Sequence, residues 1–179
     1  MAPARILGLL IAFTGLSDMS AHAGETQTTL SVVFEESAPK DIFTITNTGQ
    51  CSVKALQLQI DLSSSESGLI FDPTGAGAGV NVFQPLEIES GRHLISSFSN
   101  VRDGDQKVTF VLKELKPGSA LSFTTDVDDT LKQSERGQTM ISGGEIQGAS
   151  VNVQFDKGER RTATFSSKAM ASIYSVPCA

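Results

Sequence analysis

Apolar and polar residues alternate with a period of two along most of the chain from Gly24 onward. The clearest case is residues 56–62, in which leucine and isoleucine alternate with glutamine and aspartate. Because successive side chains of a β-strand point to opposite faces, this segment can bury one face and expose the other. Similar alternation or short apolar runs occur at residues 30–34, 43–46, 69–71, 80–83, 93–98, 108–112, 121–127, 151–155 and 162–176. The pattern predicts about nine to eleven strands.

Turn-forming residues separate these segments at the short intervals, about eight to twelve residues, that are typical of antiparallel sheets. No window of useful length repeats apolar residues at helical spacing, so the crossover helices that a parallel sheet needs are missing. Residues 129–139 are polar and compatible with a short helix or a long loop, and we favour a loop. The sequence therefore predicts an all-β fold, an antiparallel two-sheet β-sandwich of jelly-roll or immunoglobulin-like type.

The length of 179 residues fits one domain with one core. Its first residues have the features of a cleaved signal peptide, since Arg5 precedes the apolar residues 6–16 and Ala21-His22-Ala23 offers a small-residue cleavage site. The apolar run is shorter than the roughly 20 residues that span a bilayer, and no later segment is long enough. We expect residues 1–23 to be removed and residues 24–179 to form a single exported domain, periplasmic or extracellular, with no membrane span.

The formal net charge is −6, and the basic residues form no cluster larger than Arg160-Arg161. Nucleic acids and anionic lipids attract basic surfaces, so the charge argues against both as partners. The two cysteines, Cys51 and Cys178, both follow the signal segment. Because exported proteins fold in an oxidising compartment, we expect these two cysteines to form a disulfide, and two unpaired thiols are the alternative.

The stretch from Gly68 to Ile88 is rich in glycine, with the run Gly75-Ala76-Gly77-Ala78-Gly79 preceded by Asp72. A phosphate-binding loop would need a helix N-terminus after the glycines, whereas here the flanking residues are typical of strands. The glycines indicate a turn with special backbone geometry. Asp72, Gly75, Gly77 and Gly79 are candidates for the rim of a ligand site.

Asp126-Val127-Asp128-Asp129-Thr130 has the Asp-x-Asp-x-Thr spacing of haloacid-dehalogenase-type phosphatases. In those enzymes the first aspartate accepts the phosphoryl group and the second acts as acid and base beside Mg²⁺. The motif belongs on an early strand of a doubly wound sheet, which this sequence does not predict. A solvated acidic strand end is the simpler interpretation.

Carboxylates in turns are also the hard oxygen ligands that Ca²⁺ prefers. Asp126, Asp128 and Asp129 lie at one strand end, and Asp103 and Asp105 lie in another turn. We consider all five as candidate metal ligands, although neither group fits an EF-hand loop and acidic turns are often simply solvated. Whether Asp72 lies near the strand end at Asp126 is the question that the sequence leaves open.

The sequence contains few residues that could support other kinds of catalysis. His93 is the one histidine after the signal segment, and no Gly-x-Ser-x-Gly motif accompanies it. One histidine and two cysteines expected to be oxidised do not supply the three or four ligands of a zinc site. We therefore do not expect an enzyme and assign no catalytic residue.

Several segments together resemble small exported bacterial proteins that are named after the core protein of the sponge aggregation factor. They are FTITNTGQC, GLIFDPTGAGAGVNVFQPLEI, VRDGDQ and FTTDVDDTL, spread over residues 43–131. The resemblance implies an extracellular β-rich protein and calcium-dependent cell adhesion, and it brings no active-site residues with it.

The sequence as a whole favours a non-catalytic, exported β-sandwich that binds a cell-surface protein, a glycan or a second copy of itself, with Ca²⁺ as a candidate cofactor. The alternative is a metal-assisted, phosphatase-like hydrolase that uses the acidic cluster at Asp126–Thr130.

Overall fold

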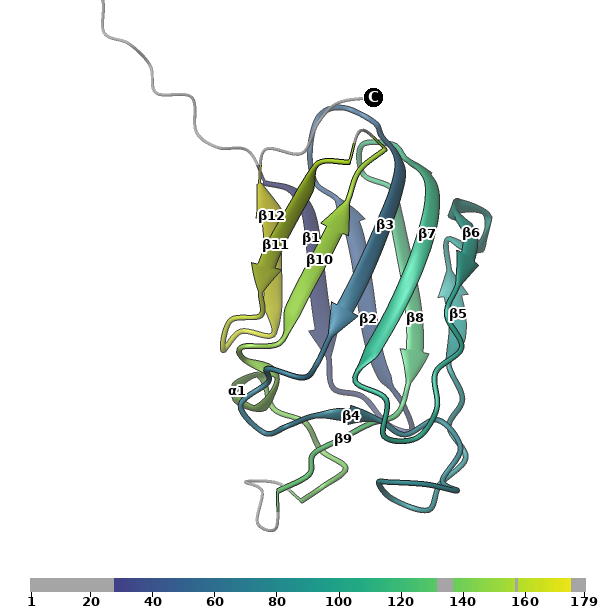
Figure 1. Ribbon diagram of the computed structural model, residues 1–179, viewed down its shortest axis with the longest axis vertical. Helices are drawn as coiled ribbons and strands as arrows, with labels where there is room; N and C mark the ends of the chain where they lie inside the picture. Colours follow the sequence, from purple (N-terminus) through teal and green to yellow (C-terminus); the bar gives the residue numbers. More distant parts are fainter. Residues whose placement is uncertain (1–27, 132–136, 157, 175–179) are drawn as a thin grey trace, which may run out of the picture.

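The computed structural model of the chain describes residues 28–131, 137–156 and 158–174. These residues form two five-stranded antiparallel sheets, packed face to face, and a two-stranded ribbon that runs across one end of the pair (Figure 1). The fold is therefore an all-β sandwich, as the period-two pattern predicts. The described residues contain twelve strands, ten in the two large sheets and two in the ribbon, slightly more than the nine to eleven expected.

Sheet A has the order β12, β1, β2, β8, β5, and sheet B has the order β11, β10, β3, β7, β6. The strands of sheet A are β1 (Thr28–Glu35), β2 (Asp41–Asn47), β5 (Glu87–Ser90), β8 (Ala120–Thr125) and β12 (Met170–Tyr174). Those of sheet B are β3 (Val53–Asp61), β6 (Ile95–Phe98), β7 (Lys107–Leu115), β10 (Ser150–Gln154) and β11 (Arg160–Thr164). A 3-10 helix, η1 (Arg92–Leu94), lies between β5 and β6 and carries the chain from sheet A to sheet B.

The inward faces of the two sheets form one hydrophobic core. In β2 every second residue is buried, which places Phe43 and Ile45 on the inner face. The ring of Phe43 stacks on Phe123 of β8 at 5.0 Å, and Phe123 meets Phe110 of sheet B at 4.8 Å. Because burying a phenylalanine contributes about 1.5–3 kcal/mol, this aromatic column joins the sheets strongly.

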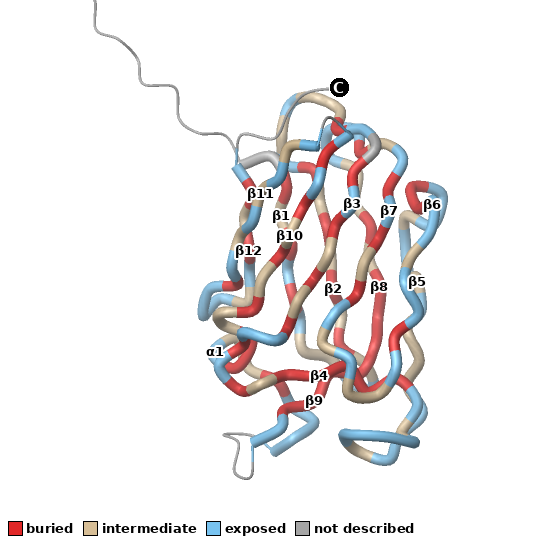
Figure 2. The backbone as a smooth tube through the Cα atoms, viewed as in Figure 1, coloured by how far each residue is buried: buried red, intermediate tan, exposed pale blue. Residues whose placement is uncertain are grey.

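The two-stranded ribbon consists of β4 (Ile70–Phe71) and β9 (Val127–Asp128), which pair antiparallel. It lies below both sheets in the view of Figure 1, and its strands are buried (Figure 2). Phe71 and Val127 belong to the same core as the two sheets. The ribbon is thus a fixed part of the sandwich, and the segments on either side of it are held in place.

Two local predictions differ from the structure, and a third is confirmed. Residues 80–83 are not a strand but part of a loop, and the strand that follows is β5, whose sequence has a single apolar residue and so gives no alternation. A one-turn helix, α1 (Gly143–Ile146), was not expected, although Ser142 and Glu145 form a capping box at its start. In the described parts of residues 129–139 the chain is a loop, as favoured above.

Several expectations concern residues outside the described ranges. The signal peptide, residues 1–23, and Cys178, the expected disulfide partner of Cys51, are among them, so cleavage and pairing stay predictions. Among the described residues, no helix has the length and apolar character needed to cross a membrane.

Candidate cation site

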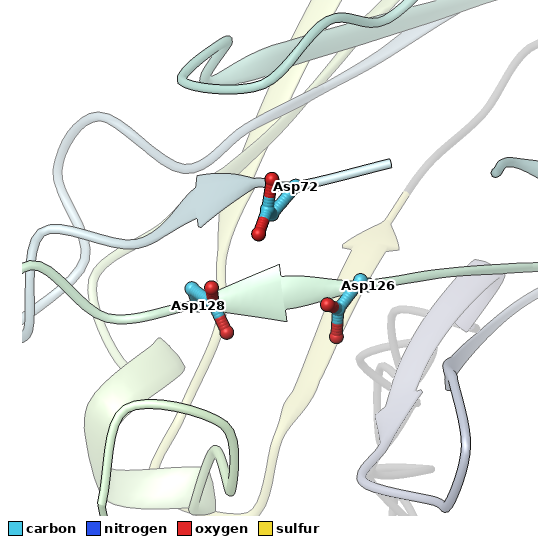
Figure 3. A group of neighbouring side chains, drawn as sticks. All are labelled: Asp72, Asp126 and Asp128. Carbon is cyan, nitrogen blue, oxygen red and sulfur yellow. The ribbon is translucent and has the colours of Figure 1, made fainter. Parts of the chain in front are cut away.

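The ribbon brings three aspartates to one place. Ile70 pairs with Asp128 and Phe71 with Val127, and the N–H of Asp72 donates to the carbonyl of Asp126 at 3.1 Å. Because side chains alternate along a strand, Phe71 and Val127 face the core, whereas the three aspartates lie on the opposite side of the ribbon. This register places the side chains of Asp72 and Asp128 on that side of the ribbon, and Asp126 lies opposite Asp72 (Figure 3).

The three carboxylates are close together and buried. Each offers an oxygen that lies within 4.8 Å of the others, the one such group of three or more acidic, histidine or cysteine residues in the described part of the chain. Asp72 and Asp128 are 0% exposed and Asp126 is 6% exposed. Neither oxygen of Asp72 accepts a hydrogen bond, and Oδ1 of Asp128 accepts none either. Buried carboxylate oxygens without donors are costly, so the cluster needs a compensating positive charge or protons.

A loop rich in glycine covers the cluster. We call residues 73–84 the glycine loop; its base is closed by the N–H of Gln84, which donates to the carbonyl of Pro73 at 3.1 Å. The N–H of Val80 donates to Oδ2 of Asp128 at 2.6 Å. A Cβ on Gly79 would lie 2.6 Å from the same oxygen and still closer to Oδ2 of Asp72. The backbone of the loop therefore rests directly on two of the carboxylates, and only glycine fits at position 79.

Among the described residues, no basic side chain forms an ion pair with the cluster. The ion pairs found in the described ranges are Lys40–Glu87, Lys107–Asp61 and Arg161–Glu159, and none includes Asp72, Asp126 or Asp128. The pKa of Asp72 is raised to about 6, mainly by burial and further by the nearby carboxyls of Asp128 and Asp103. Burial and the charge of Asp72 raise the pKa of Asp126 to about 6, and burial also raises the pKa of Asp128. The cluster thus carries unbalanced negative charge whenever its carboxyls ionise.

Asp41, the first residue of β2, is a fourth buried acid next to the cluster. Its Oδ2 accepts the N–H of Val127 at 3.1 Å, which fastens β9 to sheet A. Burial, together with the charges of Asp126 and Glu36, raises the pKa of Asp41 to about 8, although the N–H groups of Ser37 and Val127 oppose the shift. Its role is to hold the ribbon.

Asp103 and Asp105, two of the candidate ligands, do not join the cluster of three. The carboxylate of Asp103 accepts the N–H of Thr74 at 2.7 Å, those of Ala76 and Gly77 at 2.8 Å each, and the hydroxyl of Thr74 at 2.5 Å. These donors outweigh desolvation, which alone would raise the pKa of Asp103, and lower that pKa to about 2. Oδ2 of Asp105 accepts the N–H of Arg102 at 2.9 Å.

Asp129 lies beside the cluster and is buried. Its Oδ1 accepts the N–H of Leu131 at 2.8 Å, whereas its Oδ2 accepts no hydrogen bond. The structure thus brings together Asp126 and Asp128, from the acidic strand end, with Asp72, which the sequence placed on a ligand rim. The sequence did not point to Asp41, since a single aspartate at a strand start carries no signal of its own.

The glycines of the rim have the special backbone geometry that the sequence indicates. Gly75 and Gly79 have φ angles of 64° and 105°, in the region that favours glycine. Gly77 packs its backbone against Asp103, where a Cβ would lie 2.7 Å from the Cβ of that residue. No helix follows the loop, so the N-terminal helix dipole of a phosphate-binding loop is absent from this part of the structure.

Chemically, the arrangement is suited to a hard cation. Three carboxylates whose oxygens lie within 4.8 Å of one another can surround an ion with metal–oxygen distances of about 2.3–2.6 Å, the range for Ca²⁺. No protein-family model matches the chain, and no curated protein matches it.

Proposed function

We propose that this protein is an exported, non-catalytic β-sandwich module that binds one Ca²⁺ ion between Asp72, Asp126 and Asp128. The observation that carries the proposal is the carboxylate of Asp72, which is 0% exposed and accepts no hydrogen bond while it points towards Asp128 (Figure 3). A bound divalent cation supplies the missing positive charge. It is also coordinated by the carboxylate oxygens that accept no hydrogen bond.

The choice of Ca²⁺ among cations follows from the ligands. Zinc sites use mainly histidine and cysteine, and this cluster has neither. Magnesium usually keeps several of its waters, whereas these carboxylates are buried under the glycine loop. Calcium accepts irregular sets of carboxylates and backbone carbonyls, which the ribbon and the loop can provide.

The ion would act as a clamp on one end of the sandwich. Its ligands come from Asp72 just after β4, Asp126 just before β9 and Asp128 in β9, and Asp128 also holds the glycine loop through Val80. The same loop presents Val82 and Phe83, which are 40% and 73% exposed. An exposed phenylalanine on a loop ordered by Ca²⁺ supports a binding or adhesion module whose partner is a cell-surface protein, a glycan or a second copy of the chain.

The hydrolase alternative has less support. Asp126, which would accept the phosphoryl group, is only 6% exposed, and its neighbours Asp72 and Asp128 lie against the glycine loop, which leaves little room for a substrate phosphate. The sheets are antiparallel, whereas the phosphatase motif belongs on a doubly wound parallel sheet.

Calorimetric titration of the EDTA-treated protein with Ca²⁺ and with Mg²⁺ tests the proposal. We expect one Ca²⁺ site, and we expect Asp72→Asn to weaken binding by more than about 100-fold because a ligand charge is lost at a buried site. Asp61→Asn is the control, since Asp61 pairs with Lys107 on sheet B. Absence of Ca²⁺ binding, or equal affinity in the Asp72 variant, would overturn the proposal, and Asp126-dependent hydrolysis of p-nitrophenyl phosphate would contradict its non-catalytic part.

A further inference from the structure

Asp103 accepts four hydrogen bonds from the glycine loop. Its carboxylate accepts from three successive parts of the loop, the N–H groups of Thr74, Ala76 and Gly77, and from the hydroxyl of Thr74. A concave set of backbone N–H groups is a typical anion-binding nest, and here a side chain of the protein occupies it. The first half of the glycine loop is therefore tied to the turn that contains Asp103.

The second half of the loop covers the cation site, and little chain separates the two halves. Asp103 holds the loop as far as Gly77, and the contacts with the site begin at Gly79. Ala78, between them, packs against the same turn, since a Cβ on Gly104 would lie 3.4 Å from the Cβ of Ala78. Moving the loop away from Asp103 would therefore move Gly79 and Val80 off the carboxylates.

Without this attachment, little would hold the glycine loop in a single conformation. There is no charged residue between Asp72 and Glu87, and three glycines lie within five residues. Ordering such a segment costs about 1–2 kcal/mol per residue in backbone entropy, and glycine costs the most. Charge-assisted hydrogen bonds to Asp103 offset part of that cost.

The glycine loop also covers one side of the Asp72 and Asp128 carboxylates. The opposite side of the ribbon is closed by Phe71 and Val127, which are fully buried in the core. The side of the cluster away from the core is covered by Gly79 and Val80. Lifting the glycine loop would therefore uncover Asp72 and Asp128.

We infer that Asp103 is a positioning residue that holds the glycine loop closed over the cation site and so sets the rate at which the ion leaves. This inference rests on the proposed Ca²⁺ function and adds a device that controls it. Asp103 acts through the loop, because its carboxylate accepts four hydrogen bonds from it and is not one of the three whose oxygens lie within 4.8 Å of one another.

The sharpest test is Asp103→Asn, which keeps the shape of the side chain but places an NH₂ group where the N–H groups of the loop need an acceptor. Ca²⁺-loaded protein is mixed rapidly with a fluorescent chelator, and the dissociation rate is measured. We expect the rate to rise by about tenfold or more. The substitution removes hydrogen bonds to a charged group that exist only in the closed loop, so it destabilises the closed loop and not the open one. Thr74→Val, which removes only the hydroxyl donor, should raise the rate by less.

Asp105→Asn is the matched control. Asp105 lies in the same turn and carries the same charge, but its carboxylate accepts from Arg102 and not from the glycine loop. We expect its dissociation rate to equal that of the unmodified protein. A purely structural role for Asp103 would lower the melting temperature and leave the dissociation rate unchanged, so the rate separates the two roles.

The outcomes distinguish the two proposals. If the unmodified protein binds no Ca²⁺, both fail. If it binds Ca²⁺ and the Asp103 variant releases the ion at the unmodified rate, only the inference about Asp103 fails. If the Asp103 variant does not fold, the Thr74→Val variant decides, and an unchanged rate there overturns the inference.

Discussion

Gly79 is the residue at which the backbone of the glycine loop comes closest to the carboxylates. Its φ angle of 105° already favours glycine, and a Cβ there would lie 2.6 Å from Oδ2 of Asp128. We expect Gly79→Ala to push the loop outwards and to weaken Ca²⁺ binding by more than about tenfold, because the Val80–Asp128 hydrogen bond of 2.6 Å would be broken. Calorimetric titration of the variant measures the affinity.

Gly118→Ala is the control for backbone strain. Gly118 has a φ angle of 74°, in the same left-handed region, but a Cβ there would meet nothing within 4 Å. It should cost about 1 kcal/mol of stability and leave the affinity unchanged. Equal affinity in the two alanine variants would show that the close approach at Gly79 is not needed for the site.

At the scale of elements, the link between β9 and sheet A depends on the ionisation of Asp41. Its pKa is raised to about 8, chiefly by burial, whereas in the unfolded chain it would titrate near its ordinary value of 3.8. A group whose pKa rises on folding holds its proton more tightly in the folded state. The stability that it contributes is therefore complete below about pH 4 and lost as the pH rises through about 8.

We expect the melting temperature of the cation-free protein to fall as the pH rises from about 4 to about 8, with a contribution from Asp41 of up to about 1.4 kcal/mol per pH unit. Asp41→Asn, which stays neutral, should reduce this dependence. Thermal unfolding in EDTA across that pH range measures it. A variant with the same pH dependence as the unmodified protein would mean that Asp41 is not the titrating group.

Also at this scale, the strands that the sequence could predict are those with local signals. In β2, in β3 from Leu56 onward and in β7 from Val108 to Leu112, buried and solvent-facing residues alternate because one face packs into the core. β5 gave no signal because it is an edge strand with mostly exposed residues. Residues 80–83 looked like a strand because three of the four are apolar, but the N–H of Val80 is used by the side chain of Asp128 and not by a neighbouring strand.

The candidate site could be predicted only in part, for a similar reason. Asp126 and Asp128 were recognised together because they share the Asp-x-Asp-x-Thr spacing at one acidic strand end. The inclusion of Asp72 depends on the pairing of β4 with β9, a contact between distant segments that no local pattern encodes. Asp103 and Asp105 looked equivalent in the sequence, and only the position of the glycine loop separates their roles.

At the scale of the whole molecule, the ribbon shares one core with both sheets, so the cation site is coupled to global folding. Phe71 of β4 lies next to Phe43, with ring centroids 6.3 Å apart, and Phe43 stacks on Phe123. Opening the ribbon would expose the end of this aromatic column. We therefore expect the site and the sandwich to unfold together in a single cooperative transition.

A cation that binds only the folded protein should raise the midpoint of that transition. At a free Ca²⁺ concentration 100 times the dissociation constant, the stabilisation is about 2.7 kcal/mol, or a shift of about 5–10 °C for a domain of this size. Differential scanning calorimetry at increasing Ca²⁺ measures the shift, and the Asp72→Asn variant should show none. Two separate transitions, with Ca²⁺ moving only the smaller one, would mean instead that the ribbon and the glycine loop unfold independently of the sandwich.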